Sequence, residues 1–441
     1  MNSMYRAQQY PYSKAIRYDS LSAYSVPKLF LIVALLVLST LLITSSCDLM
    51  DSEKEAIEED SNEVVSEARK RIIEESNTFT FDLLSMVAQD NAQESFFVSP
   101  LSITLAFGMA LNGADGHTYD QMRDFFGLQG LSNEEINKNF QALSRYLTEL
   151  DPLVRMQIAN SVWYRDTFEV LTDFLETNRH YFDAEIESLD FSDPKAPDII
   201  NSWIHEKTHG LIDEMIEDIS PQTVMFLINA LYFQGDWAIQ FDPEQTRDAP
   251  FTTVNGEQTT VPMMQVSEEF YHYAVDDWKV IDLPYGDHHY RFTAFLPADQ
   301  DSYNGFADSF SRQHYQDLLG RLSKDTVDVY IPRFEIDFDY ENIKEDLIHM
   351  GLAYPFSRDR LADFSRISAN EPLEISDVMH RAVISVDEEG SEAAAVTVIE
   401  IIRTSIGEPE RAVIRLNRPF IFFIRDAASD SILFMGFYAG T

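Results

Sequence analysis

Two histidines in the middle of the chain have the spacing of a zinc-protease site. The segment His205-Glu-Lys-Thr-His209 matches the pattern His-Glu-x-x-His, and residues four apart on a helix share one face. Both imidazoles could then bind zinc while Glu206 activates a water molecule, with Glu214 or Glu217 as the nearest third ligand. A glycine follows the second histidine, which is typical of a helix end, where ligands are poorly held. A zinc metalloprotease is one hypothesis, and a polar surface turn without metal is the simpler one.

A segment near the C-terminus has a distinctive composition but no catalytic pattern. Residues 386–396 read as an acidic strand end, a glycine and then a run of very small residues. Glycine permits backbone angles that other residues resist, so Gly390 suits a pivot. Small side chains cost little entropy to order and fit between neighbours that are already packed. The pattern favours a segment that begins outside a sheet and can enter it.

If this segment enters a sheet as a strand, its side chains alternate between two faces. One face would carry uncharged side chains that begin small: Ser391, Ala393, Ala395, Thr397, Ile399 and Ile401. The other face would direct its charges outward: Glu392, Ala394, Val396, Val398 and Glu400. No proline interrupts residues 390–405, so every residue of such a strand would keep a backbone N–H to donate to a neighbouring strand. An ordinary half-buried strand is the alternative.

The composition excludes several other classes of protein. Lys and Arg number 33 against 74 Asp and Glu, and the resulting net charge of −41 repels nucleic acid and anionic lipid. Cys47 is the only cysteine, so the chain has no internal disulfide and no cysteine-rich zinc cluster. The sequence also lacks the Gly-x-Ser-x-Gly motif of serine hydrolases and a Gly-rich phosphate loop. We therefore expect neither a cofactor nor a nucleic-acid partner.

An apolar run near the N-terminus predicts export. Residues 29–44 are uncharged and span about sixteen positions, which is short for a membrane span and typical of a signal peptide. Cys47, after two serines, resembles the lipidated cysteine of bacterial lipoproteins, although Thr44 departs from the usual leucine. We predict a signal peptide over 1–46, an acidic tether over 47–62 and a location outside the cell or in its envelope. Membrane contact would occur only through this lipid, or through an uncleaved anchor if the cysteine is incidental.

The elements that position these groups are helical in the first half of the chain and strand-rich in the second. A serine cap at Ser99 and the following Pro100 start a helix after the short strand 96–98. Residues 223–234 form an almost unbroken apolar run, as expected of a strand covered on both faces. Further helices are predicted over 63–88, 118–126, 133–150, 170–182, 196–208 and 340–350. Residues 154–164 read as a strand, residues 326–337 alternate between apolar and polar as a strand does, and residues 375–387 and 418–438 are strand-rich. The predicted class is α+β.

Several short motifs occur in a fixed order along the chain. They are Phe97-Val98-Ser99-Pro100-Leu101-Ser102, Asn112-Gly113-Ala114, Ile228-Asn229-Ala230-Leu231-Tyr232-Phe233 with Trp237 and Phe241-Asp242-Pro243, Ile375-Ser376-Asp377-Val378-Met379-His380-Arg381-Ala382, Arg418-Pro419-Phe420 and Leu433-Phe434-Met435-Gly436. Together they resemble the serpin family, in one domain over 63–441. Glu206-Lys207-Thr208 also belongs to this pattern, which weakens the zinc hypothesis.

The resemblance implies a metastable fold with about nine helices, three sheets and an exposed reactive loop near the C-terminus. A serine protease would attack this loop, form an acyl-enzyme and be trapped when the freed loop inserts into the central sheet. The chain would then be a protease inhibitor rather than an enzyme, and we expect it to act as a monomer. A serpin-fold binding protein without inhibitory action is the alternative.

The resemblance also assigns roles to residues of the loop. Its hinge would be Glu388, Glu389, Gly390, Ser391, Glu392, Ala393, Ala394 and Ala395. Its reactive bond would be Thr404-Ser405, which suits elastase-like or subtilisin-like proteases with shallow apolar pockets. Arg403-Thr404 is the alternative bond and would suit trypsin-like proteases, which hold a carboxylate for arginine.

Four polar residues match positions that meet beneath the opening sheet of the family: Ser99, Ser102, Asn229 and His380. In apolar surroundings they should hydrogen-bond one another, because an unpaired buried polar group costs about 1–3 kcal/mol. Separate caps and surface groups are the alternative. Trp237 would mark the top of the sheet, where the loop enters.

Overall fold

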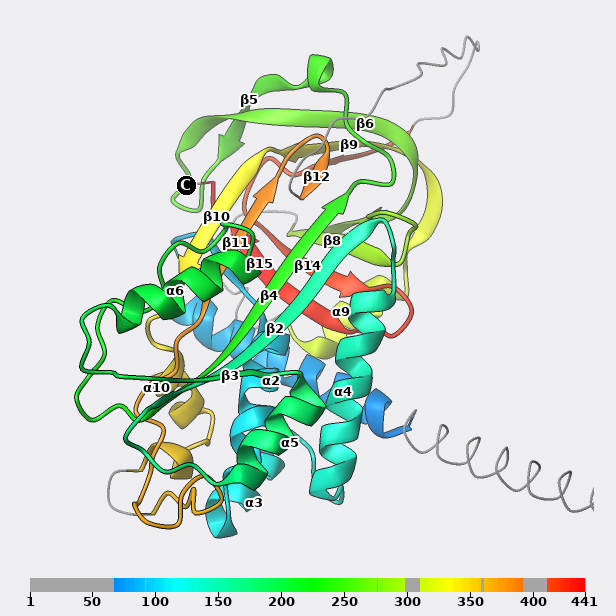
Figure 1. The fold of residues 1–441 in the computed structure, drawn as a ribbon. Coiled ribbons are helices and arrows are strands. Elements are labelled where there is room, and N and C mark those ends of the chain that lie inside the picture. Colours follow the sequence, from blue (N-terminus) through cyan, green and yellow to red (C-terminus); the bar gives the residue numbers. More distant parts are fainter. Residues whose placement is uncertain are drawn as a thin grey trace, which may run out of the picture. The chain divides into compact units, whose positions relative to one another are not determined.

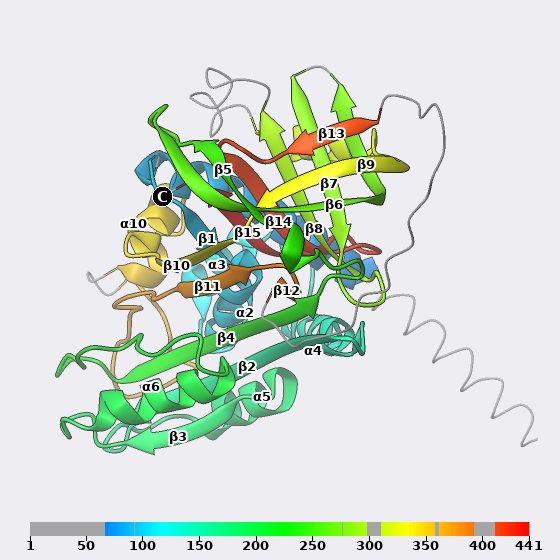
Figure 2. The same ribbon diagram turned by 90° about the horizontal axis from the view of Figure 1, so that it is seen from above.

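Three hydrogen-bonded sheets and eight α-helices make up the described part of the chain (Figures 1 and 2). The computed structural model describes residues 67–91, 93–275, 277–297, 310–357, 361–391 and 411–440. The α+β class and the three sheets expected from the sequence are confirmed. The helices are 67–90, α2 (Pro100–Leu111), α3 (Gly116–Phe125), α4 (Asn133–Glu149), α5 (Thr172–Phe182), α6 (Ala196–Lys207), α9 (Arg312–Leu319) and α10 (Ile343–His349), with short 3-10 turns at Pro243–Gln245 and Tyr354–Phe356.

The largest sheet has nine strands, and all neighbours are antiparallel except β9 and β13, which run parallel. Across the sheet they are β1 (Phe96–Val98), β15 (Ile432–Tyr438), β14 (Phe420–Asp426), β8 (Tyr290–Pro297), β7 (Trp278–Pro284), β6 (Gln258–Val275), β9 (Ser323–Pro332) and β13 (Ala412–Arg415), while β5 (Arg247–Thr252) pairs with β6. Strands β14 and β15 are buried along their whole length, which accounts for their almost uninterrupted apolar sequences.

The two smaller sheets lie side by side, but no ladder of hydrogen bonds joins them in the described residues. One contains β12 (Gly390–Ser391), β4 (Met225–Asp236), β2 (Val154–Arg165) and β3 (Glu185–Leu189), and the other contains β10 (Phe334–Asp339) and β11 (Arg381–Val386). Strand β11 lies next to β4 in both views (Figures 1 and 2). The position between β4 and β11 is therefore the interruption in what would otherwise be one sheet.

Two expectations about strands need correction. The apolar run 223–234 does form β4, but most of its side chains are only half-buried, because α6 covers one face around Ile228 and Ala230 and β11 does not pair with its edge. The alternating stretch 326–337 is two strands in different sheets. Because Pro332 has no N–H to donate, it ends β9, and β10 then begins in another sheet.

The predicted start of α2 is confirmed and links this helix to the core. Ser99 is the N-cap, its side chain accepts a hydrogen bond from the backbone N of Ser102 at 3.1 Å, and Pro100 stands at the first helical position. Ser99 Oγ also donates to the carbonyl of Leu433 in β15 at 2.8 Å. The cap thereby fixes the helix to the buried centre of the large sheet.

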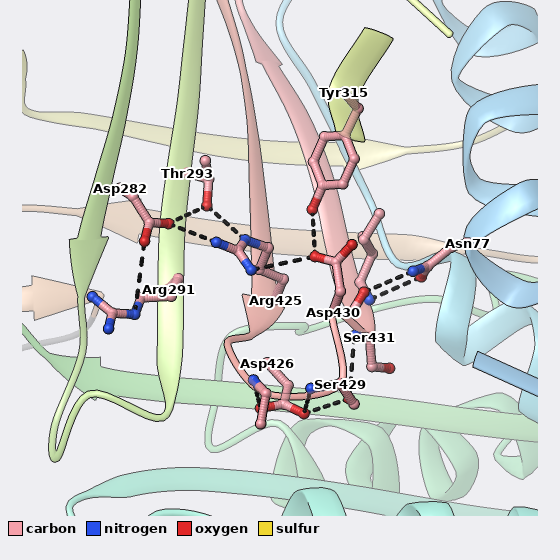
Figure 3. A network of polar contacts seen from close by, with 12 residues as sticks. Asn77, Asp282, Arg291, Thr293, Tyr315, Arg425, Asp426, Ser429, Asp430 and Ser431 are labelled. Carbon is pink, nitrogen blue, oxygen red and sulfur yellow. Dashed lines mark hydrogen bonds and ion pairs between the residues drawn. The ribbon is translucent and has the colours of Figure 1, made fainter. Parts of the chain in front are cut away.

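A buried ionic network holds the end of the β14–β15 hairpin (Figure 3). Arg425 is 7% exposed, and its guanidinium donates to Asp282 Oδ1 at 3.0 Å, to Thr293 Oγ1 at 2.9 Å and to Asp430 Oδ1 at 3.3 Å. Tyr315 OH donates to the same Asp430 oxygen at 2.8 Å. Buried charges are stable only when paired and hydrogen-bonded, as they are here. This network connects β7, β8, β14 and the turn before β15 to α9.

Candidate functional site

A pocket separates the facing edges of β4 and β11. Leu231 and Phe233 of β4 line one side, Val383 and Ser385 of β11 line the other, and Phe434 of β15 also lines it. Two neighbouring strands that do not pair with each other can accept a further strand between them. The pocket is thus a candidate site for strand insertion.

The two residues of β12 occupy the first two positions of such a strand, which we call its first rung. Gly390 and Ser391 pair antiparallel with Asp236 and Gly235 of β4. The backbone N of Asp387 donates to the carbonyl of Gly390 at 3.0 Å, so the chain reverses direction between β11 and β12. The carboxylate of Asp387 accepts hydrogen bonds from the N–H groups two and three residues further on, at 2.9 and 3.1 Å. We call residues 387–390 the hinge turn.

Trp237 holds the hinge turn from the β4 side. Its backbone N donates to the carbonyl of Glu389 at 2.8 Å, and its indole Nε1 donates to the carbonyl of Asp387 at 2.8 Å. Its ring stacks on Tyr285, with centroids 4.4 Å apart and ring planes 10° from parallel. The structure therefore brings Trp237 against the residues expected to form the hinge.

The two glutamates of the hinge turn have different surroundings. Glu388 is 6% exposed, its Oε1 accepts a hydrogen bond from Thr246 Oγ1 at 2.6 Å, and its Oε2 lies 3.5 Å from Arg333 Nη1. By contrast, Glu389 Oε2 is buried and has no hydrogen-bond partner among the described residues. Glu388 therefore anchors the turn, whereas no such side-chain anchor is seen for Glu389 Oε2.

The reason for a glycine at position 390 differs from the sequence interpretation. Gly390 does not adopt the left-handed conformation that favours glycine, so its role as a pivot is not visible in its backbone angles. An added Cβ would instead lie 2.1 Å from the carbonyl oxygen of Gly235 and 2.6 Å from Cα of Asp236. Glycine is required because two backbones approach closely.

Ser391 points into the protein, as expected for the inserting face. Ser391 is 3% exposed, and its Oγ lies 2.8 Å from the hydroxyl of Tyr285. Burial raises the pKa of Tyr285, so this phenol stays protonated and can donate or accept through its OH. Sequence reasoning missed Tyr285, which lies in none of the motifs singled out from the sequence.

The fold and this site agree with one known family. The serpin family model, described as serine protease inhibitor, matches residues 74–439. The chain belongs to the serpin family.

Known serpins cover almost all of the described part of the chain. Leukocyte elastase inhibitor from Xenopus tropicalis is 32% identical over 375 residues, which span 82% of this chain and 97% of the relative. The crystal structure of tengpin, a thermophilic serpin, in its native state has a TM-score of 0.75 at 32% identity and covers 84% of this chain and 94% of its own. Human thyroxine-binding globulin has a TM-score of 0.76 at 28% identity, with coverages of 84% and 98%. These matches support protease inhibition in general, although one similar structure is named as a binding protein.

The four polar residues predicted to meet in this serpin do lie together. Ser99 N donates to His380 Nε2 at 3.0 Å, and Ser102 Oγ donates to the carbonyl of Asn229 at 3.2 Å. The side chain of Asn229 turns away and donates to Asn160 Oδ1 at 2.8 Å, a partner on β2 that sequence reasoning missed. The cluster therefore connects the start of α2 to β4 and to the segment before β11. Its role in loop insertion stays a prediction.

The zinc-protease hypothesis lacks the required geometry. Helix α6 ends at Lys207, and His209 lies beyond it with a φ of 52°, so the two histidines do not share a helical face. His209 Nε2 lies 2.7 Å from Gln157 Oε1, whereas His205 Nε2 lies 3.5 Å from Asp213 Oδ1. No group of three or more His, Cys, Asp or Glu side chains in the described part of the chain is arranged to hold a metal ion. The histidine pair is a helix end, as the following glycine indicated.

Several predicted features lie outside the described residues. They are the signal peptide over 1–46, the tether over 47–62 with Cys47, the later hinge residues Glu392, Ala393, Ala394 and Ala395, and the bond residues Arg403, Thr404 and Ser405. Where helices are described, none is long and apolar enough to cross a membrane.

Stability should depend on pH through His380. Burial lowers the pKa of His380 to about 4 from an ordinary value of 6.5. Below pH 6.5, His380 therefore becomes protonated in the unfolded chain while it stays neutral in the folded chain. The contribution of His380 to the free energy of unfolding is complete above pH 6.5 and is lost as the pH falls toward 4. The loss amounts to about 3 kcal/mol. In urea unfolding, His380→Gln should lose less stability than the wild type between pH 7 and pH 4. Equal pH dependence of the two proteins would contradict the assignment.

A methyl group at position 390 should displace β12. Gly390→Ala places a Cβ against backbone atoms that cannot move aside, and we expect a loss of about 1–3 kcal/mol in unfolding free energy. Trp237 fluorescence should also change, because its indole N–H binds the hinge turn. The matched control is Gly320→Ala, where an added Cβ meets its nearest atom at 3.4 Å. The close-approach explanation is wrong if both variants behave alike.

Proposed function

We propose that this serpin inhibits serine proteases as a suicide substrate and then acts only once. The protease serine attacks the carbonyl carbon of Thr404, the bond to Ser405 breaks, and the new amino group of Ser405 takes up the proton. The ester that remains would be trapped when the freed loop inserts between β4 and β11. The proposal needs no cofactor and no catalytic group of the inhibitor.

The first rung at β12 is the observation that carries this proposal. Gly390 and Ser391 already pair with β4, and Ser391 lines the pocket between β4 and β11. The hinge turn makes β12 antiparallel to β11, and β12 is also antiparallel to β4. A strand that continued from Ser391 could therefore pair with both neighbours, which is the favourable antiparallel arrangement on each side.

The class of target protease follows from the residue before the cut. A small β-branched residue at Thr404 fits the shallow apolar pockets of elastase-like and subtilisin-like proteases. The similarity to a relative named leukocyte elastase inhibitor supports this class. If Arg403-Thr404 is the bond that is cut, trypsin-like proteases become the targets.

A direct test uses an elastase-like, a subtilisin-like and a trypsin-like protease mixed separately with the chain. We expect a covalent complex that survives SDS, and N-terminal sequencing of the released fragment identifies the bond. The nicked chain should also melt at a higher temperature than the intact one. Clean cleavage by all three proteases without a complex would instead favour a binding protein with a serpin fold.

Ser391→Arg should convert the inhibitor into a substrate. Ser391 is buried beside Tyr285, and an unpaired charge at this place would block insertion. The matched control is Glu392→Arg, which carries the same new side chain on the face predicted to point outward. Inhibition that survives in Ser391→Arg would count heavily against loop insertion.

We also propose that the chain is a bacterial lipoprotein held outside the cytoplasm through Cys47. The apolar run 29–44, the small residues before Cys47 and the acidic tether after it support this location. In a bacterial host, Cys47→Ser should move the protein from the membrane fraction to the soluble fraction. A variant that stays with the membrane would point to an uncleaved anchor instead.

A further inference from the structure

We infer that Tyr285 is a positioning residue that fixes the register in which the reactive loop inserts. Its hydroxyl binds Ser391, whose side chain is the first in β12 and is buried. This inference rests on the proposed inhibitory function and deepens it, because it names the contact that decides how insertion begins.

The ring of Tyr285 is held firmly beside the mouth of the pocket. It is fully buried, stacks on Trp237 and meets Phe233 edge-on with ring centroids 5.1 Å apart. Its backbone N donates to the carbonyl of Tyr290 at 2.9 Å. An added Cβ on Gly235 would lie 3.1 Å from the ring, so the strand that carries the first rung is in contact with it as well. The hydroxyl is therefore presented at a fixed point.

The hydroxyl distinguishes the correct register from its neighbours. Ser391 Oγ and Tyr285 OH are each other's hydrogen-bond partners, and Ser391 lines a pocket whose other side chains are mainly apolar. A slip of one residue would reverse the faces of the whole strand. It would bring either Gly390, which has no side chain, or Glu392, which carries a charge, to the phenol. Only the observed register pairs both buried hydroxyls.

Register matters because insertion competes with hydrolysis of the ester. A loop that starts in the wrong register must leave the pocket and start again, and the protease can complete hydrolysis during that delay. Tyr285 is fully buried within the inhibitor and cannot contact the protease, so it should not affect the initial attack. Its loss should therefore change the outcome of the reaction and not its first step.

The test measures how many inhibitor molecules are consumed for each protease trapped, together with the rate of the initial attack. The protease is the one that forms the SDS-stable complex with the wild-type chain. For Tyr285→Phe we expect consumption to rise roughly two- to tenfold, as the loss of one hydrogen bond implies, with the initial rate unchanged. Ser391→Ala should behave in the same way, whereas Ser391→Thr keeps a hydroxyl and should stay near the wild type.

A double variant separates positioning from a merely structural role. Each single variant leaves one buried hydroxyl without a partner, so both should lower thermal stability, and the combination of Tyr285→Phe with Ser391→Ala should regain much of it. If the hydrogen bond sets the register, the double variant still consumes excess inhibitor, because the bond remains absent. If consumption returns to the wild-type level together with stability, the inference is overturned.

Two other results are equally decisive. Unchanged consumption in Tyr285→Phe, with the wild type forming its complex, overturns the positioning role and leaves the proposed function intact. A wild-type chain that forms no complex with any of the three proteases overturns the proposed function and this inference together.

Discussion

The structure depends on a strand position between β4 and β11. Among the described residues, only Gly390 and Ser391 occupy this position. These strands are neighbours in space, yet the described residues form no ladder between them. Backbone groups of a sheet are stable when they are paired, so a sheet with an open position is less stable than one that a further strand completes. The described residues contain the start of such a strand, β12 (Gly390–Ser391). In the mechanism proposed above, the free energy of completing the sheet would remain available as long as the position stays open.

Contacts near the C-terminal end of β4 and within its N-terminal half hold the strand beside this position. Near its C-terminal end, Trp237 binds the carbonyls of Asp387 and Glu389 and holds the hinge turn beside the pocket. Further along the strand, the carbonyl of Asn229 accepts a hydrogen bond from Ser102, at the start of α2. These contacts are local and polar, so each can be exchanged without unfolding the large sheet. The insertion proposed above would therefore rearrange the small sheet and leave the large sheet intact.

Local rules of sequence account for much of this framework. The cap at Ser99, the short strand 96–98 and the apolar strand at 225–236 follow from capping and hydrophobic patterns, and the structure contains them. The polar residues around α2 could be assigned only through the family resemblance, because their partners are as many as 334 positions apart in the chain. No local pattern reports such distances.

The sequence did not indicate which distant residues come into contact at the site. Tyr285 is 106 positions from Ser391, and nothing near either residue indicates that the two meet. The glycine at 390 was correctly singled out, but the reason for it is the carbonyl of Gly235, which lies on another strand. The histidine pair shows the opposite error, since a spacing that is correct on a continuous helix has no meaning once the helix ends at Lys207.

The insertion proposed above would change the small sheet while the large sheet stays as it is. The buried ionic network stabilises the large sheet. Arg425, Asp282 and Asp430 are paired and hydrogen-bonded between β7, β14 and the turn before β15, in the sheet against which the pocket lies (Figure 3). Removing one partner from such a network leaves a buried charge uncompensated, so the arrangement resists distortion. In the proposed mechanism, strand insertion would then release free energy by completing the small sheet. In the proposed mechanism, the contrast between this paired network and the incomplete sheet beside it would allow a single cut to drive a large change.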